Sequence, residues 1–280
     1  MIHCSVIIPH MNQEKHLQRC LEALCGQTLD KNAYEVIVID NGSKKDVSHL
    51  VKEYGFDYYI YDKNQNPYTC RNLGIQKARG EILCFLDAKC LPVKGWLKSG
   101  LAAIAHADLI GGHYEVDLDS SSLLSKIFPL MYLNNEKNIS NGKGVSVGNL
   151  FVRKAVFDKI GLFKTTYFSG NDILFTEEAI RQGFRLNYSS STVVHYPPKS
   201  FGKLKNDAFK YGTGSYLTGQ KSLLDSLRFW MPMKIDTFFK TIKFREYQLS
   251  KVDLIRAWFL IWRIKIQFAL GILKGTFSRN

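Results

Sequence analysis

The sequence predicts an α/β domain with a mainly parallel central sheet, followed by a helical extension at its C-terminus. Short apolar runs of strand type alternate with segments of helical spacing in the first part of the 280-residue chain. Strands that alternate with helices form parallel sheets through right-handed crossovers. Hydrophobic residues make up 45% of the chain and charged residues 22%, which is typical of a globular protein and excludes bulk disorder.

The individual elements follow from these patterns. Residues 5–9 (SVIIP) and 35–39 (EVIVI) are apolar throughout or nearly so, as strands buried on both faces are. Between them, Leu17, Leu21 and Leu24 recur at helical spacing before Gly26. We expect further strands at 58–61, 81–86, 107–112 and 192–194, and further helices at 121–133 and 172–183.

Polar residues follow three of the predicted strands at their carboxyl ends. His10, Asn12 and Glu14 follow the first strand, Asp40-Asn41-Gly42-Ser43 the second, and Asp87-Ala88-Lys89 the strand at 81–86. Parallel α/β sheets bind ligands beyond the carboxyl ends of their strands. One edge of the sheet is therefore expected to gather two carboxylates, an amide and a Gly-Ser turn.

Charge and cysteine usage limit the environment of the chain. The net charge is +13, and residues 201–280 hold 15 Lys and Arg against 5 Asp and Glu, which favours an anionic partner for this region, lipid or nucleic acid. The six cysteines form no C-x-x-C pair, which indicates a reducing compartment. The chain enters a strand pattern directly, so no secretory leader is expected.

The last apolar segment predicts a basic amphipathic helix. Arg256, Arg263, Gln267 and Lys274 fall on one narrow stripe between residues 254 and 274, and aromatic and aliphatic residues cover the rest. Charged residues interrupt the segment too often for a membrane span. A helix of this type suits a membrane interface, so deleting residues 251–280 should release the protein from anionic vesicles while the sheet survives. Packing on the catalytic domain or in a homodimer is the alternative.

Six segments, in order, resemble the inverting family-two glycosyltransferases of the GT-A fold. They are Val6 to Asn12, Asp40 to Ser43, Arg71-Asn72-Leu73-Gly74, Phe85-Leu86-Asp87, Gly148-Asn149 with Ser169-Gly170-Asn171-Asp172, and Val193-Val194-His195. Each segment alone is weak evidence, but their order is that of the family across about residues 4–197. The resemblance implies a GT-A catalytic domain at 1–200, with a donor-nucleotide half at 1–106, an acceptor half at 107–200 and the helical extension at 201–280.

The resemblance also implies roles for individual residues. Asp172 is the expected catalytic base, at the start of a helix whose dipole favours its ionised form. The donor-binding residues are expected to be Pro9, Asn12, Glu14, Asp40, Gly42, Ser43, Arg71, Asp87, Ala88 and Lys89. The acceptor side is expected to include Gly148, Asn149 and Asn171. The alternatives are an N-cap role for Asp172 and a turn-closing role for Asp40.

The metal site departs from the family pattern. The family places D-x-D after the fourth strand, and this chain has Asp87-Ala88-Lys89. Three alternatives remain: the charge of Lys89 stabilises the departing diphosphate without a metal, Asp87 and His195 hold Mg²⁺ or Mn²⁺, or activity has been lost. His195 has its own alternative, a core histidine at the end of a strand.

The expected function is sugar transfer with inversion from a UDP, GDP or dTDP sugar to the hydroxyl of a glycan or lipid-linked acceptor. The basic helix places the enzyme peripherally on the cytoplasmic face of a membrane, in polysaccharide or glycolipid synthesis. An inactive nucleotide-sugar-binding protein is the first alternative. A nucleic-acid partner is not expected, because no nucleic-acid motif occurs, and no strand is followed by the G-x-G-x-x-G of a dinucleotide oxidoreductase.

Overall fold

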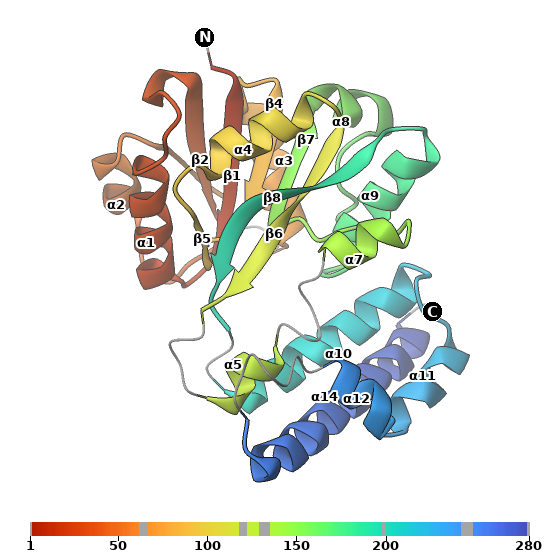
Figure 1. The fold of residues 1–280 in the computed structure, drawn as a ribbon. Coiled ribbons are helices and arrows are strands. Elements are labelled where there is room, and N and C mark those ends of the chain that lie inside the picture. Colours follow the sequence, from red (N-terminus) through yellow and green to blue (C-terminus); the bar gives the residue numbers. More distant parts are fainter. Residues whose placement is uncertain are drawn as a thin grey trace. The chain divides into compact units, whose positions relative to one another are not determined.

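The computed structural model describes residues 2–61, 66–117, 122–128, 135–197, 200–241 and 249–278. These residues form two compact units. The first contains residues 1–115, 134–166 and 172–196, and the second contains 116–133, 167–171 and 197–280. Figure 1 shows the elements of both. The functional halves expected at 1–106 and 107–200 stay a prediction.

An eight-stranded sheet forms the centre of the first unit, in the order β3-β2-β1-β4-β7-β6-β8-β5. The strands are β1 (Cys4–His10), β2 (Tyr34–Asp40), β3 (Asp57–Ile60), β4 (Ile82–Leu86), β5 (Cys90–Pro92), β6 (Leu109–Val116), β7 (Asn149–Arg153) and β8 (Leu186–His195). The first four pair in parallel, as the apolar runs predict. The β4–β7, β6–β7 and β5–β8 pairs are antiparallel, so the sheet is mixed.

Helices of the first unit connect these strands. They are α1 (Glu14–Cys25), α2 (Ser48–Glu53), α3 (Pro67–Lys77), α4 (Trp96–Ile104), α7 (Asn135–Ser140), α8 (Lys154–Ile160) and α9 (Asn171–Arg181), with a 3₁₀ turn at Lys31–Ala33. The face of α1 that carries Leu17, Leu21 and Leu24 is buried, as predicted. All six cysteines are free thiols.

The helix α3 brings side chains to the carboxyl edge of the parallel strands. It crosses from β3 back to β4, so its first turns, with Tyr68 and Arg71, start at that edge. Gly74 sits against β1 so closely that a Cβ there would collide with the side chain of Ile7. This close packing fixes the height of Arg71 above the sheet edge.

The second unit is a helical cluster around the longest helix of the chain. Its described helices are α5 (Leu123–Ile127), α10 (Phe201–Leu217), α11 (Leu223–Trp230), α12 (Ile235–Thr241) and α14 (Lys251–Phe277). Of the helix predicted at 121–133, the structure describes α5 with its flanking residues Ser122 and Phe128, and residues 121 and 129–133 lie outside the described residues. Glycines let α10 and α14 touch backbone to backbone: a Cβ at Gly212 would collide with the carbonyl oxygen of Phe268.

The α14 helix uses much of its apolar surface inside this unit. Ala257, Ile261 and Ile264 are buried in a core that also contains Leu204 and Ala208 of α10. Packing within the protein, which was the alternative to a membrane interface, therefore applies to this face of the helix. Deleting residues 251–280 would uncover the core of the unit, so the clean truncation expected from the sequence is not expected from the structure. No helix in the described part of the chain is long and apolar enough to cross a membrane.

Candidate active site

Two loops at the carboxyl edge of the sheet are joined by hydrogen bonds. The backbone N–H of Asn12 donates to Ser43 Oγ at 2.9 Å, and the backbone N–H of Lys44 donates to Asn12 Oδ1 at 2.9 Å. Asn12 and Gly42 both have positive φ, at 52° and 81°, which only Gly and a few short polar residues adopt readily. The predicted donor residues Asn12, Gly42 and Ser43 thus belong to one joined structure.

Asp40 lies at the end of β2 beside these loops and is buried. Its Oδ1 accepts from the backbone N–H of Ser43 at 2.7 Å, and its Oδ2 accepts from the Tyr58 hydroxyl at 3.0 Å. The turn-closing interaction is therefore present, and each oxygen keeps a lone pair for a ligand. Burial and the neighbouring Asp40 raise the pKa of Tyr58, so this hydroxyl stays a donor.

Unsatisfied polar atoms lie beside Asp40, at the end of β1 and directly after β2. His10, which follows the half-buried Pro9 and pairs with Asp40 in the parallel register, is 1% exposed. Neither of its ring nitrogens has a hydrogen-bond partner among the described residues, and neither does Oδ1 of the buried Asn41. Burial lowers the pKa of His10, although Asp40 and Glu14 act against the shift. A neutral imidazole and an amide oxygen are therefore available here.

Arg71, in the second turn of α3, and Asp87, directly after β4, form a close ion pair. The guanidinium Nη2 lies 2.7 Å from Asp87 Oδ1, and the Arg71 side chain is almost wholly buried. Burial raises the pKa of Asp87, but the charges of Arg71 and Lys89 outweigh it, so the net shift is downward and Asp87 is ionised. The structure therefore brings the two predicted donor residues Arg71 and Asp87 into direct contact.

Asp172, in the first turn of α9, is held by two hydrogen bonds. Its Oδ1 accepts from the Tyr68 hydroxyl at 2.8 Å and its Oδ2 from the backbone N–H of Val147 at 3.1 Å. The Arg71 guanidinium lies over the Tyr68 ring, 5.4 Å from its centre. Direct contacts therefore link Asp87 to Arg71, Arg71 to Tyr68, and Tyr68 to Asp172. Burial and then the Asp172 charge raise the pKa of Tyr68, which keeps its proton.

The three residues expected on the acceptor side differ in their surroundings and hydrogen bonds. A Cβ on Gly148 would lie 3.0 Å from both Asp87 Oδ2 and the Tyr114 hydroxyl, so the glycine keeps space beside the carboxylate. The buried amide of Asn149 accepts from the indole of Trp96 and donates to the backbone carbonyls of His113 and Ser191, which ties β7 to α4, β6 and β8. Asn171 donates to the Tyr167 carbonyl, and its buried Oδ1 has no partner among the described residues.

His195 ends β8 opposite Cys90 of β5, next in sequence to Lys89. Burial and then the Lys89 charge lower the pKa of His195 to about 3, against the effect of Asp87, so its imidazole is neutral. A neutral imidazole and the ionised Asp87 are both metal donors, but among the described residues no group of three or more His, Cys, Asp and Glu could hold a metal ion. A metal at these two residues would need further oxygen ligands from its substrate or from water.

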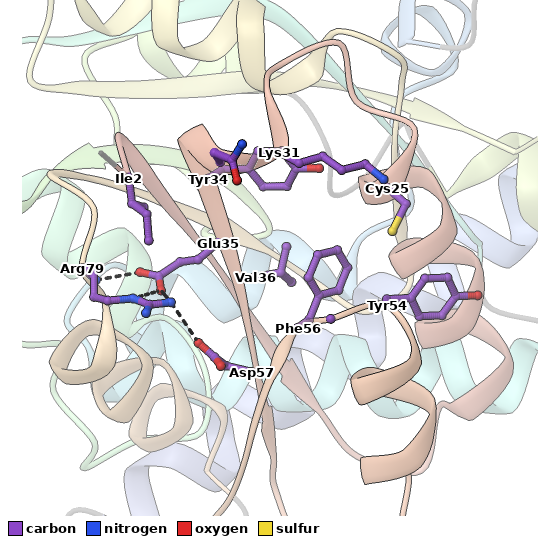
Figure 2. Close-up of a pocket in the computed structure, with 12 residues that line it drawn as sticks. Ile2, Cys25, Lys31, Tyr34, Glu35, Val36, Tyr54, Phe56, Asp57 and Arg79 are labelled. Carbon is purple, nitrogen blue, oxygen red and sulfur yellow. Dashed lines mark hydrogen bonds and ion pairs between the residues drawn. The ribbon is translucent and has the colours of Figure 1, made fainter.

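A pocket of about 400 Å³ lies at the opposite edge of the sheet, where β2 and β3 begin. Figure 2 shows that Arg79 joins Glu35 and Asp57 there. Arg79 Nε and its backbone N–H both donate to Glu35 at 2.6 Å. Arg79 thus belongs to a structural ion pair at the amino ends of the strands, away from the carboxyl edge.

Solved structures share this fold. A mannosyltransferase from Pyrobaculum calidifontis, solved in complex with GDP-Man and Mn²⁺, matches 99% of this chain and 88% of its own, with a TM-score of 0.67 and 12% identity. At this identity the match shows the fold alone. Together with the mixed sheet and the polar edge at β1, β2 and β4, it places the chain in the GT-A class.

The sequence comparisons are more specific. The chain belongs to glycosyl transferase family 2, whose model matches residues 5–161. It is 33% identical to glycosyltransferase AglE of Haloferax volcanii over 75% of this chain and 72% of AglE. It is 24% identical, over 80% of this chain and 76% of the relative, to a Methanococcus voltae enzyme named dolichyl N-acetyl-alpha-D-glucosaminyl phosphate 3-beta-D-2,3-diacetamido-2,3-dideoxy-beta-D-glucuronosyltransferase. The resemblance drawn from the six sequence segments is confirmed, and the chain is a glycosyltransferase.

Proposed function

We propose that this glycosyltransferase moves a sugar from a nucleoside-diphosphate sugar to an acceptor hydroxyl in one inverting step, with Asp172 as the base. The observation that carries the proposal is the chain of contacts from Asp87 to Asp172. These contacts join Asp87, the carboxylate proposed to lie beside the diphosphate, to Asp172, a buried carboxylate whose two oxygens both accept hydrogen bonds. An oriented base of this kind takes the proton from the hydroxyl as the hydroxyl attacks.

The donor side is proposed to be the joined loops after β1 and β2 with Asp40 between them. Asp40 keeps one lone pair on each oxygen for a ribose or base donor, and the unpartnered nitrogens of His10 offer further hydrogen bonds. A GDP sugar is bound by the Pyrobaculum structure. UDP, GDP and dTDP sugars all remain candidates, and a screen of donor cleavage across the three separates them.

We propose two alternative ways in which the enzyme stabilises the charge of the diphosphate. In the first, the ammonium of Lys89 stabilises the charge of the leaving nucleoside diphosphate. In the second, Asp87 and the neutral His195 hold Mg²⁺ or Mn²⁺, which would neutralise the same charge when bound. In both, Arg71 keeps Asp87 ionised and fixed in position.

Chelation separates the two accounts. If Lys89 acts alone, donor cleavage survives EDTA and falls about 10²–10³-fold in Lys89→Ala, as when one stabilising donor is removed from an active site. If EDTA stops the wild type and Mn²⁺ restores it, the metal account holds. Nucleoside diphosphate that binds by calorimetry without any donor cleavage would instead support the inactive sugar-nucleotide-binding protein.

We further propose a glycan or lipid-linked acceptor, with the enzyme peripheral on the cytoplasmic face of a membrane in polysaccharide or glycolipid synthesis. The name of the Methanococcus relative contains dolichyl N-acetyl-alpha-D-glucosaminyl phosphate, which supports a lipid-linked acceptor. Residues 201–280 hold 15 Lys and Arg against 5 Asp and Glu, and this positive charge supports a membrane location. Transfer of a radiolabelled sugar to lipid extract, compared with transfer to soluble glycan, tests this choice.

A further inference from the structure

The α11 helix has the opposite polarity from a helix packed on a soluble protein. Its apolar side chains Leu224 and Leu227 are 75% and 62% exposed, whereas Ser226 is 2% exposed. Ser226 satisfies its hydroxyl by donating to the Leu223 carbonyl. A surface helix normally turns its apolar stripe toward the core. The described residues of the second unit leave the outward stripe on α11 uncovered.

The neighbouring helices extend this exposed stripe. Met231 and Ile235, at the end of α11 and the start of α12, are exposed, and so are Ile255 and Phe259 of α14. These last two belong to the first half of α14, on a different side from its buried residues Ala257 and Ile261. We call Leu224, Leu227, Met231, Ile235, Ile255 and Phe259 the apolar surface.

Hydrogen bonds hold the parts of the apolar surface together. The Trp262 indole donates to the Trp230 carbonyl at 2.8 Å, and the Lys265 ammonium donates to the Met231 carbonyl at 2.7 Å. The Trp258 indole donates to the Met233 carbonyl at 2.8 Å. These bonds fasten the segment between α11 and α12 along α14, as Figure 1 shows for the helices. The surface is thus a fixed feature of the second unit.

Cations outnumber carboxylates around the apolar surface. Arg228, Lys234, Lys251 and Arg256 are exposed on the same three helices and the turn between α11 and α12. The same helices carry the carboxylates Asp225, Asp236 and Asp253, the last of which pairs with Arg256. Residues 201–280 as a whole hold 15 Lys and Arg against 5 Asp and Glu, so the net charge of this region is positive. Apolar side chains flanked by Lys and Arg, with Trp rings beside them, are typical of segments that lie in the headgroup region of a bilayer. Large exposed apolar patches on soluble proteins mark interaction sites.

We propose that the apolar surface seats this protein on a bilayer that contains anionic lipids. The charge of the patch decides between this occupant and a second copy of the chain. Two copies meeting through this face would bring cationic rims together, whereas anionic headgroups complement them. The inference rests on the membrane location proposed above and goes further by naming the surface that makes the contact.

Vesicle flotation with the full chain tests the proposal. We expect binding to vesicles of phosphatidylcholine mixed with phosphatidylglycerol, and much weaker binding to phosphatidylcholine alone. Leu224→Gln with Leu227→Gln should lower the affinity at least about tenfold at low and at high salt, because burial of apolar area is not screened. Arg228→Gln and Lys234→Gln should each lower it about fivefold at low salt and reduce the salt dependence.

The control is Ile60→Gln, which changes an apolar side chain of similar exposure, 63%, on β3 of the first unit. It should bind vesicles as the wild type does. Donor cleavage is measured on every variant and should not change, so failure of vesicle binding and failure of the proposed reaction are distinguishable. The proposal is overturned if the wild type ignores the anionic vesicles or if the Leu224 and Leu227 variant binds like the wild type. A dimer that the same variant converts to monomer would assign the surface to self-association.

Discussion

Replacing Asp172 by Asn should stop sugar transfer while the protein stays folded. The change removes the base and keeps the size of the side chain, and loss of a general base lowers rates by about 10²–10⁴-fold. The Asn amide can still accept from the Val147 N–H through Oδ1 and donate to the Tyr68 oxygen through Nδ2, so both structural contacts of the carboxylate have a replacement.

The cost to stability follows from those two contacts. A hydrogen bond to a charged group contributes about 1.5–3 kcal/mol and a neutral one about 0.5–1.5, so exchanging both loses about 2 kcal/mol. For a chain of this size each kcal/mol shifts the melting temperature by about 2–4 °C, which predicts a fall of about 4–8 °C. A large loss of rate with a small loss of stability therefore distinguishes a base from a purely structural residue.

The assay is release of nucleoside diphosphate from the donor that the wild type cleaves, beside thermal melting and calorimetric titration with the nucleoside diphosphate. Nucleotide affinity should be nearly unchanged in Asp172→Asn. Glu178→Gln is the matched control. It removes a carboxylate of the same helix, and that carboxylate pairs with Arg181 at the surface. Turnover in Asp172→Asn within threefold of the wild type would show that the base lies elsewhere.

Three further predictions follow from other contacts. Tyr68→Phe removes one hydrogen bond from Asp172 and should slow transfer by about 2–10-fold without weakening nucleotide binding; an unchanged rate would show that Tyr68 does not position the base. Burial lowers the pKa of His10, so the unfolded chain binds more protons and stability should fall as the pH drops below about 6.5. Urea midpoints from pH 7 to pH 5 should fall less steeply in His10→Phe, and equal slopes would contradict this account. Gly212→Ala should destabilise the second unit by about 1–3 kcal/mol, since its Cβ meets the Phe268 carbonyl, and partial proteolysis with melting measures this; an unchanged melting curve would contradict the close packing.

The parallel half of the fold could be predicted from sequence because its signals are local. The runs at 5–9 and 35–39 became β1 and β2, and the polar residues after them meet at one edge, since parallel strands end together. The position of β7 could not be predicted, because its antiparallel pairing with β4 depends on partners far along the chain.

The site was predictable in part for the same reason. Asp40 and Asp87 follow apolar runs directly, and Arg71 is carried by a recognisable helix motif. Tyr58 and Tyr68 were missed, because an aromatic residue beside an apolar run has the pattern of a core residue. The partner of the Tyr68 hydroxyl is Asp172, 104 residues away, and no local spacing encodes such a contact.

The hydrogen bonds between Asn12, Ser43 and Lys44 also bear on how new donor preferences could arise. The two loops are joined by these bonds, so replacing Asn12 or Ser43 removes a hydrogen bond from the other loop. Libraries that randomise one loop at a time would sample mostly broken sites. Variants with altered sugar-nucleotide choice should instead be found when positions after β1 and after β2 are varied together, and relatives with different donors should differ at both loops as a set.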